Sequence, residues 1–372
     1  MRPGPELAEF RKQLLGWFSR FQRDLPWRRT REPYRIWISE IMLQQTRVAA
    51  VLPYYERFIE RFPDVRALAT APQEEVLRLW SGLGYYSRAR NLQAAAQQIV
   101  AKHNAQFPER EEDVLALPGI GRYTAAAVLS IAGGQNYAVL DGNVARVLAR
   151  VDAIRGELRD AKRWQSLQAT ASAVLDPKAP GDWNQAMMEL GATVCTPKSP
   201  HCLLCPVAEF CGARKLGIAE ELPEKRKKRE TVDVTLAAAV FTDAQGNTIL
   251  LRPPAARAGK AEPDDVPALV SEMWHFPTIS ASENPEEELR RHLKKFLKNG
   301  LHATIQLLAV GNVRHAVTYR SVTILPFRVC VPQLPRLRNA KILALNNLSA
   351  VPISNLTRKI GLAAMASLAA NQ

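Results

Sequence analysis

Several features are missing from this sequence of 372 residues, and each absence argues against a class of protein. No apolar run is long enough to cross a bilayer, and no charged segment followed by an apolar stretch opens the chain, so we expect neither a membrane protein nor a secreted one. No internal repeat of about 20–50 residues is visible, which argues against a solenoid. The hydrophobic fraction of 47% argues against wholesale disorder.

Cysteine is scarce, with five residues in all, and four of them lie within one segment of 17 residues. The four are Cys195, Cys202, Cys205 and Cys211, whereas Cys330 stands alone. In a chain without secretory features, such a group predicts a metal site rather than disulfides. Four thiolates in one short loop can hold a [4Fe–4S] cluster or a structural zinc ion, and general spacing rules leave both open. We interpret Cys330 as a small buried apolar residue.

Acidic residues are in deficit, because 36 Asp and Glu stand against 50 Lys and Arg, which gives a net charge of +14. The excess is shared by residues 1–216 and 217–372, so no single basic tail explains it. Such a balance favours a polyanionic partner, because cationic side chains that neutralise phosphates release counterions. A protein that is merely basic stays open as the alternative at this point.

The sequence changes character near its middle. Residues 10–216 show apolar residues three and four positions apart, which predicts helices, and Pro33 suits the first turn of a helix expected to run through Thr46. The charged run 224–230 is typical of a connector. Beyond it we predict strands at 231–235, 248–251 and 321–325, and a helix at 285–298. The expected organisation is a multidomain one, with an all-α domain over 1–216, a basic linker over 217–230 and an α+β domain over 231–372.

A glycine pair marks a tight turn before one of the predicted helices. In residues 117–125, Gly119 and Gly121 flank Ile120, which would plug the turn into its own domain. The turn would expose backbone N–H groups at a helix N-terminus, where anions are favoured. The whole string resembles the helix–hairpin–helix element of the endonuclease III superfamily of DNA glycosylases. That resemblance implies that Gly119, Ile120 and Gly121 bind the DNA backbone without reading its sequence.

Two carboxylates are candidates for catalysis. Asp141 follows the hairpin at the start of a new helix, where it could serve as an N-cap, and its place resembles that of the superfamily's catalytic aspartate. Glu40 lies among apolar neighbours, and a desolvated carboxyl has a raised pKa and can act as an acid near neutral pH. Adenine leaves only when protonated, so an acid for the base and a counter-charge for the sugar form a two-carboxylate design.

The string around Glu40, with its double glutamine at 44–45, closely resembles the MutY family of adenine DNA glycosylases. The resemblance implies Glu40 as the acid, Asp141 as the stabiliser of the sugar, and Arg28, Glu189 and Asn143 as organisers of the adenine pocket. Tyr123 stands where lyases of the superfamily carry a lysine, and it cannot form a Schiff base, so a monofunctional enzyme is expected with Tyr123 against the flipped adenine. The resemblance further implies Gln45 as a wedge in the duplex, and Leu83 and Tyr85 at the opposite base.

Residues 231–372 resemble the Nudix-like recognition domain of MutY proteins, on the string 273–277. No Nudix catalytic motif is present, so this half is expected to bind rather than to catalyse. The loop that senses 8-oxoguanine in the family corresponds here to residues 315–320. Thr318 keeps its hydroxyl, whereas Val317 and Tyr319 replace the family's phenylalanine and histidine, so activity on A:G mispairs could be more prominent.

Together these features predict a monofunctional adenine glycosylase that acts on A:8-oxoguanine or A:G mispairs in duplex DNA. The spacing of Cys195, Cys202, Cys205 and Cys211 matches the cluster loop of the resembled enzymes and favours a [4Fe–4S] cluster over zinc. Two alternatives remain: a bifunctional lyase similar to endonuclease III that acts on oxidised pyrimidines, and a catalytically inactive DNA-binding relative. We expect a monomer without membrane attachment, located in a bacterial cytoplasm at the nucleoid.

Overall fold

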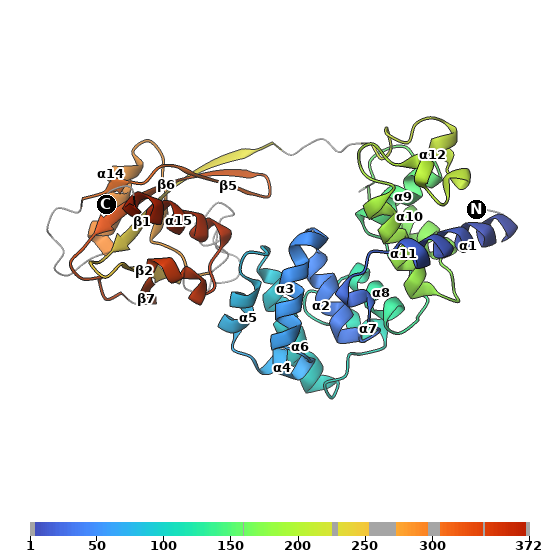
Figure 1. Cartoon of the computed structure of the whole chain (residues 1–372), viewed down its shortest axis with the longest axis horizontal. Coiled ribbons are helices and arrows are strands. Elements are labelled where there is room, and N and C mark those ends of the chain that lie inside the picture. The colour runs from blue at the N-terminus through green and yellow to red at the C-terminus, as the bar shows by residue number, and fades with distance from the viewer. Residues whose placement is uncertain are drawn as a thin grey trace. The chain divides into compact units, whose positions relative to one another are not determined.

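A computed structural model describes residues 4–158, 160–224, 230–252, 273–296, 306–337 and 339–369. The chain forms two compact units (Figure 1). The first unit joins Met1–Thr70 with Asn91–Lys227, and the second joins Ala71–Arg90 with Lys228–Gln372. Residues 71–90, which the sequence assigns to the helical domain, therefore pack with the C-terminal part of the chain. Among the described residues no helix is long and apolar enough to span a membrane.

The first unit is helical, as predicted. Its helices are α1 (Gly4–Phe21), α2 (Pro33–Leu43), α3 (Val48–Arg61), α4 (Val65–Thr70), most of α6 (Ser87–Lys102), α7 (Glu111–Leu115), α8 (Arg122–Ile131), α9 (Gly142–Val151), α10 (Ala161–Val174), α11 (Pro180–Thr193) and α12 (Gly212–Lys215). Short 3-10 turns, η1 (Pro26–Arg28), η2 (Cys202–Leu204) and η3 (Ala208–Phe210), complete it. The prediction that the second long helix runs through Thr46 is wrong, because α2 ends at Leu43 and Gln45 adopts a left-handed φ of 58° in the turn that follows.

Close packing of α9 against α11 builds one wall of the cleft described below. Apolar side chains of α1, α9, α10 and α11 form one core, in which the rings of Phe10 and Trp183 lie 5.6 Å apart. Gly191 on α11 permits the approach, because a Cβ atom there would lie 2.7 Å from the Cβ atom of Asn143 on α9. Larger residues at position 191 would push the two helices apart.

The second unit is α+β, as predicted. Its elements are α5 (Gln73–Trp80), β1 (Val232–Thr242), β2 (Asn247–Leu251), β3 (Thr278–Ser280), α14 (Pro285–Phe296), β4 (Leu308–Ala309), β5 (Val313–Val317), β6 (Arg320–Cys330), β7 (Ala340–Ala344), η4 (Leu345–Ala350) and α15 (Asn355–Ala369). The main sheet has the order β3-β1-β6-β4, and β5 also pairs with β6. The central pair β1 and β6 is parallel, from Val232 opposite Arg320 to Thr242 opposite Cys330, while β2 and β7 form a separate antiparallel pair.

Among the described residues, α14 packs on one apolar face of the main sheet, and α15 and η4 pack on the other. Leu289 and Leu293 of α14 contribute to the first face, and Leu356 and Ile360 of α15 contribute to the second. The predicted strands and the predicted helix at 285–298 are found as parts of β1, β2, β6 and α14, with residues 297–298 outside the described residues. Most of the charged run 224–230 also lies outside them. The interpretation of Cys330 as buried is wrong, because it is exposed at the end of β6.

Candidate active site

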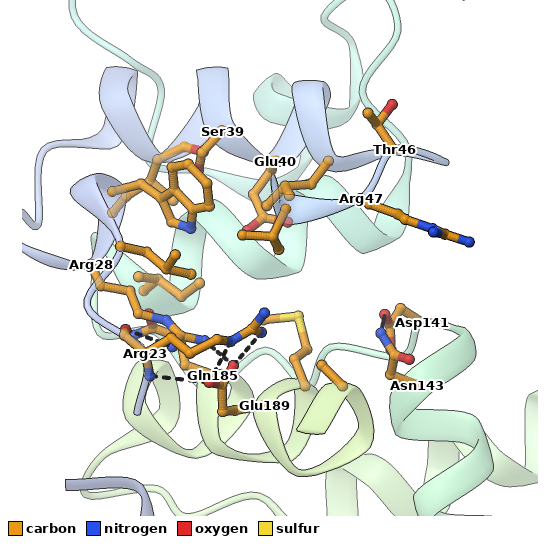
Figure 2. A pocket seen from close by; sticks show the side chains of 18 of the residues that line it. Arg23, Arg28, Ser39, Glu40, Thr46, Arg47, Asp141, Asn143, Gln185 and Glu189 are labelled. Carbon is orange, nitrogen blue, oxygen red and sulfur yellow. Dashed lines mark hydrogen bonds and ion pairs between the residues drawn. The ribbon is translucent and has the colours of Figure 1, made fainter. Parts of the chain in front are cut away.

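A cleft of about 470 Å³ lies in the first unit, between α2 and α8 on one side and α9 and α11 on the other (Figure 2). It gathers every side chain that the sequence predicts for the adenine pocket. These are Arg28, Glu40, Tyr123, Asp141, Asn143 and Glu189. They come from η1, α2, α8, α9 and α11, so only the folded chain brings them together.

Glu40 projects into the cleft from α2 and is 5% exposed. Burial raises the pKa of its carboxyl to about 7; a hydrogen bond from Tyr123 opposes the shift, and the charge of Asp141 adds to it. A carboxyl with this pKa carries its proton in a large fraction of molecules at neutral pH, which a general acid requires.

Tyr123 lies in the first turn of α8, directly after the glycine hairpin. Its hydroxyl donates a hydrogen bond of 2.6 Å to Oε2 of Glu40 and lies 3.6 Å from the sulfur of Met188. Burial raises the pKa of Tyr123 well above its usual value, and the charges of Glu40 and Asp141 act in the same direction. The phenol therefore stays protonated and donates, which leaves Oε1 of Glu40 as the oxygen that can carry the acidic proton.

Asp141 is the N-cap of α9, so the structural and catalytic readings of this residue coincide. Its Oδ1 accepts a 2.7 Å hydrogen bond from the backbone N–H of Val144, and its Oδ2 accepts a 3.1 Å bond from Nδ2 of Asn143. Burial raises the pKa of Asp141, while these bonds and the charge of Arg146 act against the shift. Donors aimed at both oxygens favour the ionised form.

Arg146 connects this carboxylate to the cysteine loop, and the sequence alone gave no sign of it. Its Nη2 donates to Oδ1 of Asn143 at 2.9 Å and to the carbonyl of Gly191 at 2.7 Å, and its Nε donates to the carbonyl of Cys195 at 2.9 Å. The amide of Asn143 is thereby oriented with its NH₂ group toward Asp141. A basic residue one turn into an amphipathic helix looks like a solvated side chain in sequence, yet Arg146 is only 8% exposed.

Glu189 is paired with two arginines at the floor of the cleft (Figure 2). Its Oε1 accepts from Nε of Arg23 at 2.8 Å, and its Oε2 accepts from Nη2 of Arg23 at 2.6 Å and from Nη2 of Arg28 at 2.8 Å. Burial alone would raise the pKa of Glu189, but these bonds outweigh it and lower the pKa to about 2. Glu189 is thus a fixed acceptor and Glu40 a titrating acid. No motif in the sequence marks Arg23, so its place in the cleft could not be predicted.

The glycine hairpin lies between α7 and α8 and matches its prediction in shape. Gly119 has a φ of 77°, where a Cβ atom would also lie 2.7 Å from that of Asn91. Ile120 is 7% exposed and plugs the turn into the unit, whereas Gly119 and Gly121 are exposed with α8 starting directly behind them. Gln45 is exposed in the turn after α2 and does not line the cleft, although its neighbours Thr46 and Arg47 do.

The residues predicted to meet the opposite base all lie in the second unit. Leu83 is buried and Tyr85 is 43% exposed, in the turn between α5 and α6. Thr318 and Tyr319 form the two-residue connection between β5 and β6, where Thr318 is exposed with a φ of 56°. Arg320 lies 4.4 Å from the centre of the Tyr319 ring and donates to its hydroxyl at 2.8 Å.

The four clustered cysteines line one cavity beside α9, in line with their prediction. The pKa of the Cys205 thiol is raised to about 12, chiefly by burial and in part by the three other cysteines, so the four sulfurs share one environment. Donors face them: Nη1 of Arg150 lies 3.3 Å from Sγ of Cys195, and the backbone of Val207 hydrogen-bonds Cys205. Such donors stabilise sulfur that carries negative charge.

The donor set fits an iron–sulfur cluster. All four cysteines line the same cavity, and four cysteine thiolates are the ligand set of a [4Fe–4S] cluster. Cys195, Cys202, Cys205 and Cys211 would each supply one thiolate to the cluster, which would fix the fold of the loop from α11 to α12.

Comparison with known proteins places these features in a family. Residues 38–176 match the family model described as HhH-GPD superfamily base excision DNA repair protein, and residues 195–211 match the iron–sulfur binding domain of endonuclease III. The second match confirms the predicted iron–sulfur loop. In solved structures, a thermostable thymine-DNA glycosylase is similar with a TM-score of 0.53 and 28% identity, over 57% of this chain and 98% of that one. A trapped endonuclease III–DNA complex, at 23% identity and a TM-score of 0.50, shares the fold.

The fold and the cleft thus define a base excision DNA repair protein of the helix–hairpin–helix class. A human adenine DNA glycosylase is 48% identical over 226 residues, which are 58% of this chain and 41% of the human one. A mouse adenine DNA glycosylase is 35% identical over 373 residues, which cover 89% of this chain and 72% of the mouse one. The chain belongs to the adenine DNA glycosylase family. It spans less than half the length of the human relative.

Proposed function

We propose that this protein hydrolyses the N-glycosidic bond of adenine mispaired with 8-oxoguanine or guanine in duplex DNA. One observation carries the proposal: the buried carboxyl of Glu40, with a pKa raised to about 7, shares a cleft with the carboxylate of Asp141, which caps α9. Family membership, the net charge of +14 and the exposed glycine hairpin support DNA as the partner.

The proposed reaction uses both carboxyls. Glu40 gives its proton to a ring nitrogen of the flipped adenine, and the bond between the sugar and the base breaks with its electron pair passing to adenine. The carboxylate of Asp141 stabilises the positive charge that develops on the sugar. Water adds to the sugar and releases a proton that restores the acid, so the products are free adenine and an abasic site. Glu189 and Arg28 would hold the edge of the base.

Tyr123 supports a monofunctional enzyme over the lyase alternative. Tyr123, directly after the hairpin, carries a phenol whose pKa is raised by burial. It has no amine that could form a Schiff base with the sugar. Excision should therefore stop at the abasic site. Reading of the partner base is assigned to Leu83, Tyr85, Thr318 and Tyr319 of the second unit, as the family resemblance implies.

The test is incubation of the purified protein with two duplexes, one with A:8-oxoguanine and one with thymine glycol. Strands are analysed with and without hot alkali. Alkali-dependent cleavage only at the adenine is the expected result. Cleavage at thymine glycol without alkali would overturn both the substrate and the role of Tyr123, and no cleavage of either duplex would leave only a DNA-binding protein.

A further inference from the structure

The turn between α5 and α6, here called the 81–86 loop, has an unusual backbone. Gly82 and Gly84 have φ values of 106° and 80°, and Tyr85 has a φ of 49°. Three left-handed residues within four positions disfavour this conformation in an isolated chain, most of all at Tyr85, which has a Cβ atom. The loop nevertheless presents Tyr85 with 43% of its surface exposed. Something must hold it in this shape.

Part of the support comes from the loop's own neighbours. Nε1 of Trp80 donates to the carbonyl of Gly84 at 3.1 Å, and Nη2 of Arg88 donates to the same carbonyl at 3.0 Å. The guanidinium of Arg88 lies 5.5 Å from the centre of the Tyr85 ring and 5.3 Å from that of Trp80. These contacts fix the peptide at Gly84, and they leave the peptide at Gly82 to other partners.

The other partners come from residues 352–355, here called the strip, which lead into α15 about 270 residues later in the chain. Nδ2 of Asn355 donates to the carbonyl of Gly82 at 3.0 Å. The carbonyl of Ile353 accepts from Oγ of Ser81 at 2.7 Å and from the hydroxyl of Tyr86 at 3.3 Å. The same hydroxyl accepts from the backbone N–H of Gly82 at 3.2 Å, so both sides of the Gly82 residue are held.

The strip is itself held by backbone hydrogen bonds and by burial. The backbone N–H of Trp274 donates to the carbonyl of Pro352 at 3.1 Å, and Ile353 is 1% exposed. Oγ of Ser354 caps α15 by accepting from the backbone N–H of Thr357 at 3.0 Å. Asn355 therefore starts a capped helix that packs on the main sheet. A donor on such a base has little freedom, which suits it to fix a loop rather than to follow it.

We propose that Asn355 is a positioning residue for recognition of the partner base: it holds the 81–86 loop so that Tyr85 is presented to the base opposite adenine. The assignment rests on the proposed function, because only that function gives Tyr85 a partner base. With this role for Asn355, residues 231–372 contribute to recognition of the partner base in two ways, the first being the β5–β6 hairpin. Through Asn355 they set the shape of a loop that sequence order assigns to the helical domain.

The test is the variant Asn355→Asp in the full chain. Aspartate keeps the size of asparagine and suits a helix N-terminus, but its carboxylate cannot donate to the carbonyl of Gly82. Asn346→Asp is the matched control, since it makes the same charge change at an exposed site of η4 in the same unit. Affinities are measured for duplexes with A:8-oxoguanine, A:G and A:T, together with the single-turnover excision rate at saturating enzyme.

Asn355→Asp should lose about fivefold or more of its preference for the A:8-oxoguanine duplex over the A:T duplex. The saturating excision rate should stay within about twofold of the wild-type rate, because the cleft lies in the other unit. A preference equal to that of Asn346→Asp would overturn the proposal, as would an equal loss of affinity for all three duplexes. If Asn355→Asp melts at a lower temperature than the control, the preference of Asn355→Ser is measured as well. A partial loss of preference in Asn355→Ser supports the proposal, and no loss overturns it. A wild-type protein that excises no adenine refutes the proposed function instead.

Discussion

The two units hold their predicted functional side chains in opposite ways. In the first unit, Glu40 and Glu189 are buried; burial raises the pKa of Glu40, whereas the bonds from two arginines lower the pKa of Glu189. In the second unit, Tyr85 and Thr318 are exposed, and strained turns present them. Chemistry on a base needs exclusion of water and tuned acidity, whereas reading a base within a duplex needs an exposed surface of fixed shape. Substitutions in the first unit should therefore change rates, and those in the second should change preferences.

The largest effect is expected from loss of the acid. Glu40→Gln keeps the size of the side chain but cannot donate a carboxylic proton, so excision from an A:8-oxoguanine duplex should fall by about 10²–10⁴-fold. Affinity for the duplex should stay near that of the wild type. Single-turnover kinetics and a binding titration measure both quantities. Glu32→Gln, just before α2, is the control and should leave the rate unchanged; an equal rate for both variants would remove Glu40 from the mechanism.

Loss of the sugar-stabilising charge ranks next. Asp141→Asn should lower the excision rate by about 10²–10³-fold, because a neutral amide cannot stabilise the sugar cation. Asparagine is as good an N-cap as aspartate, so thermal melting of the variant should match that of the wild type. Asp152→Asn, at the other end of α9, serves as the control for rate and melting. A lower excision rate that is accompanied by a lower melting temperature would indicate a purely structural role for Asp141.

Removal of a cluster ligand should destabilise the first unit and leave the second unit unchanged. Cys202→Ser should lower the iron content and the melting temperature of the first unit by about 10 °C or more, because metal-binding free energy is part of folding free energy. Melting of the second unit should not change, and Cys330→Ser should change neither quantity. Iron analysis and calorimetry provide the readouts. Full iron content in Cys202→Ser would contradict the ligand assignment.

The smallest effect is expected at the β5–β6 connection. Thr318→Ala removes a hydroxyl that is exposed at the tip of the hairpin, and it should lower the preference for 8-oxoguanine over guanine by about two- to fivefold with little change in rate. Ser321→Ala, an exposed hydroxyl on neighbouring β6, is the control. Competition binding with the two mispairs measures the ratio. An unchanged ratio would mean that the substituted loop does not sense the oxidised base.

Much of the first unit could be predicted from sequence because its signals are local. A glycine pair, a capping aspartate and four spaced cysteines each specify a short piece of backbone, and the structure has each in its predicted form. Contacts between distant segments could not be predicted. Arg23 and Arg146 carry no motif, since their roles arise only where α9, α11 and the turn before η1 meet.

For the same reason, the sequence does not show that residues 71–90 pack with the C-terminal part of the chain. Their helical periodicity continues that of the preceding helices, so nothing local separates them from the first unit. The bonds of Ser81 and Gly82 to Ile353 and Asn355 join residues about 270 positions apart. The end of α2 was also missed, because the left-handed φ of Gln45 is rare for a residue other than glycine.

The pH dependence of excision tests the central claim most directly. Burial raises the pKa of Glu40 to about 7, and only the protonated acid can activate adenine. The single-turnover rate at saturating enzyme should therefore be highest below pH 7 and fall as the pH rises through about 7, toward tenfold per unit. In Tyr123→Phe the hydrogen bond that lowers this pKa is lost, so the fall should move to higher pH. A wild-type rate that stays level from pH 6 to pH 9 would contradict the account of Glu40 as the buried acid.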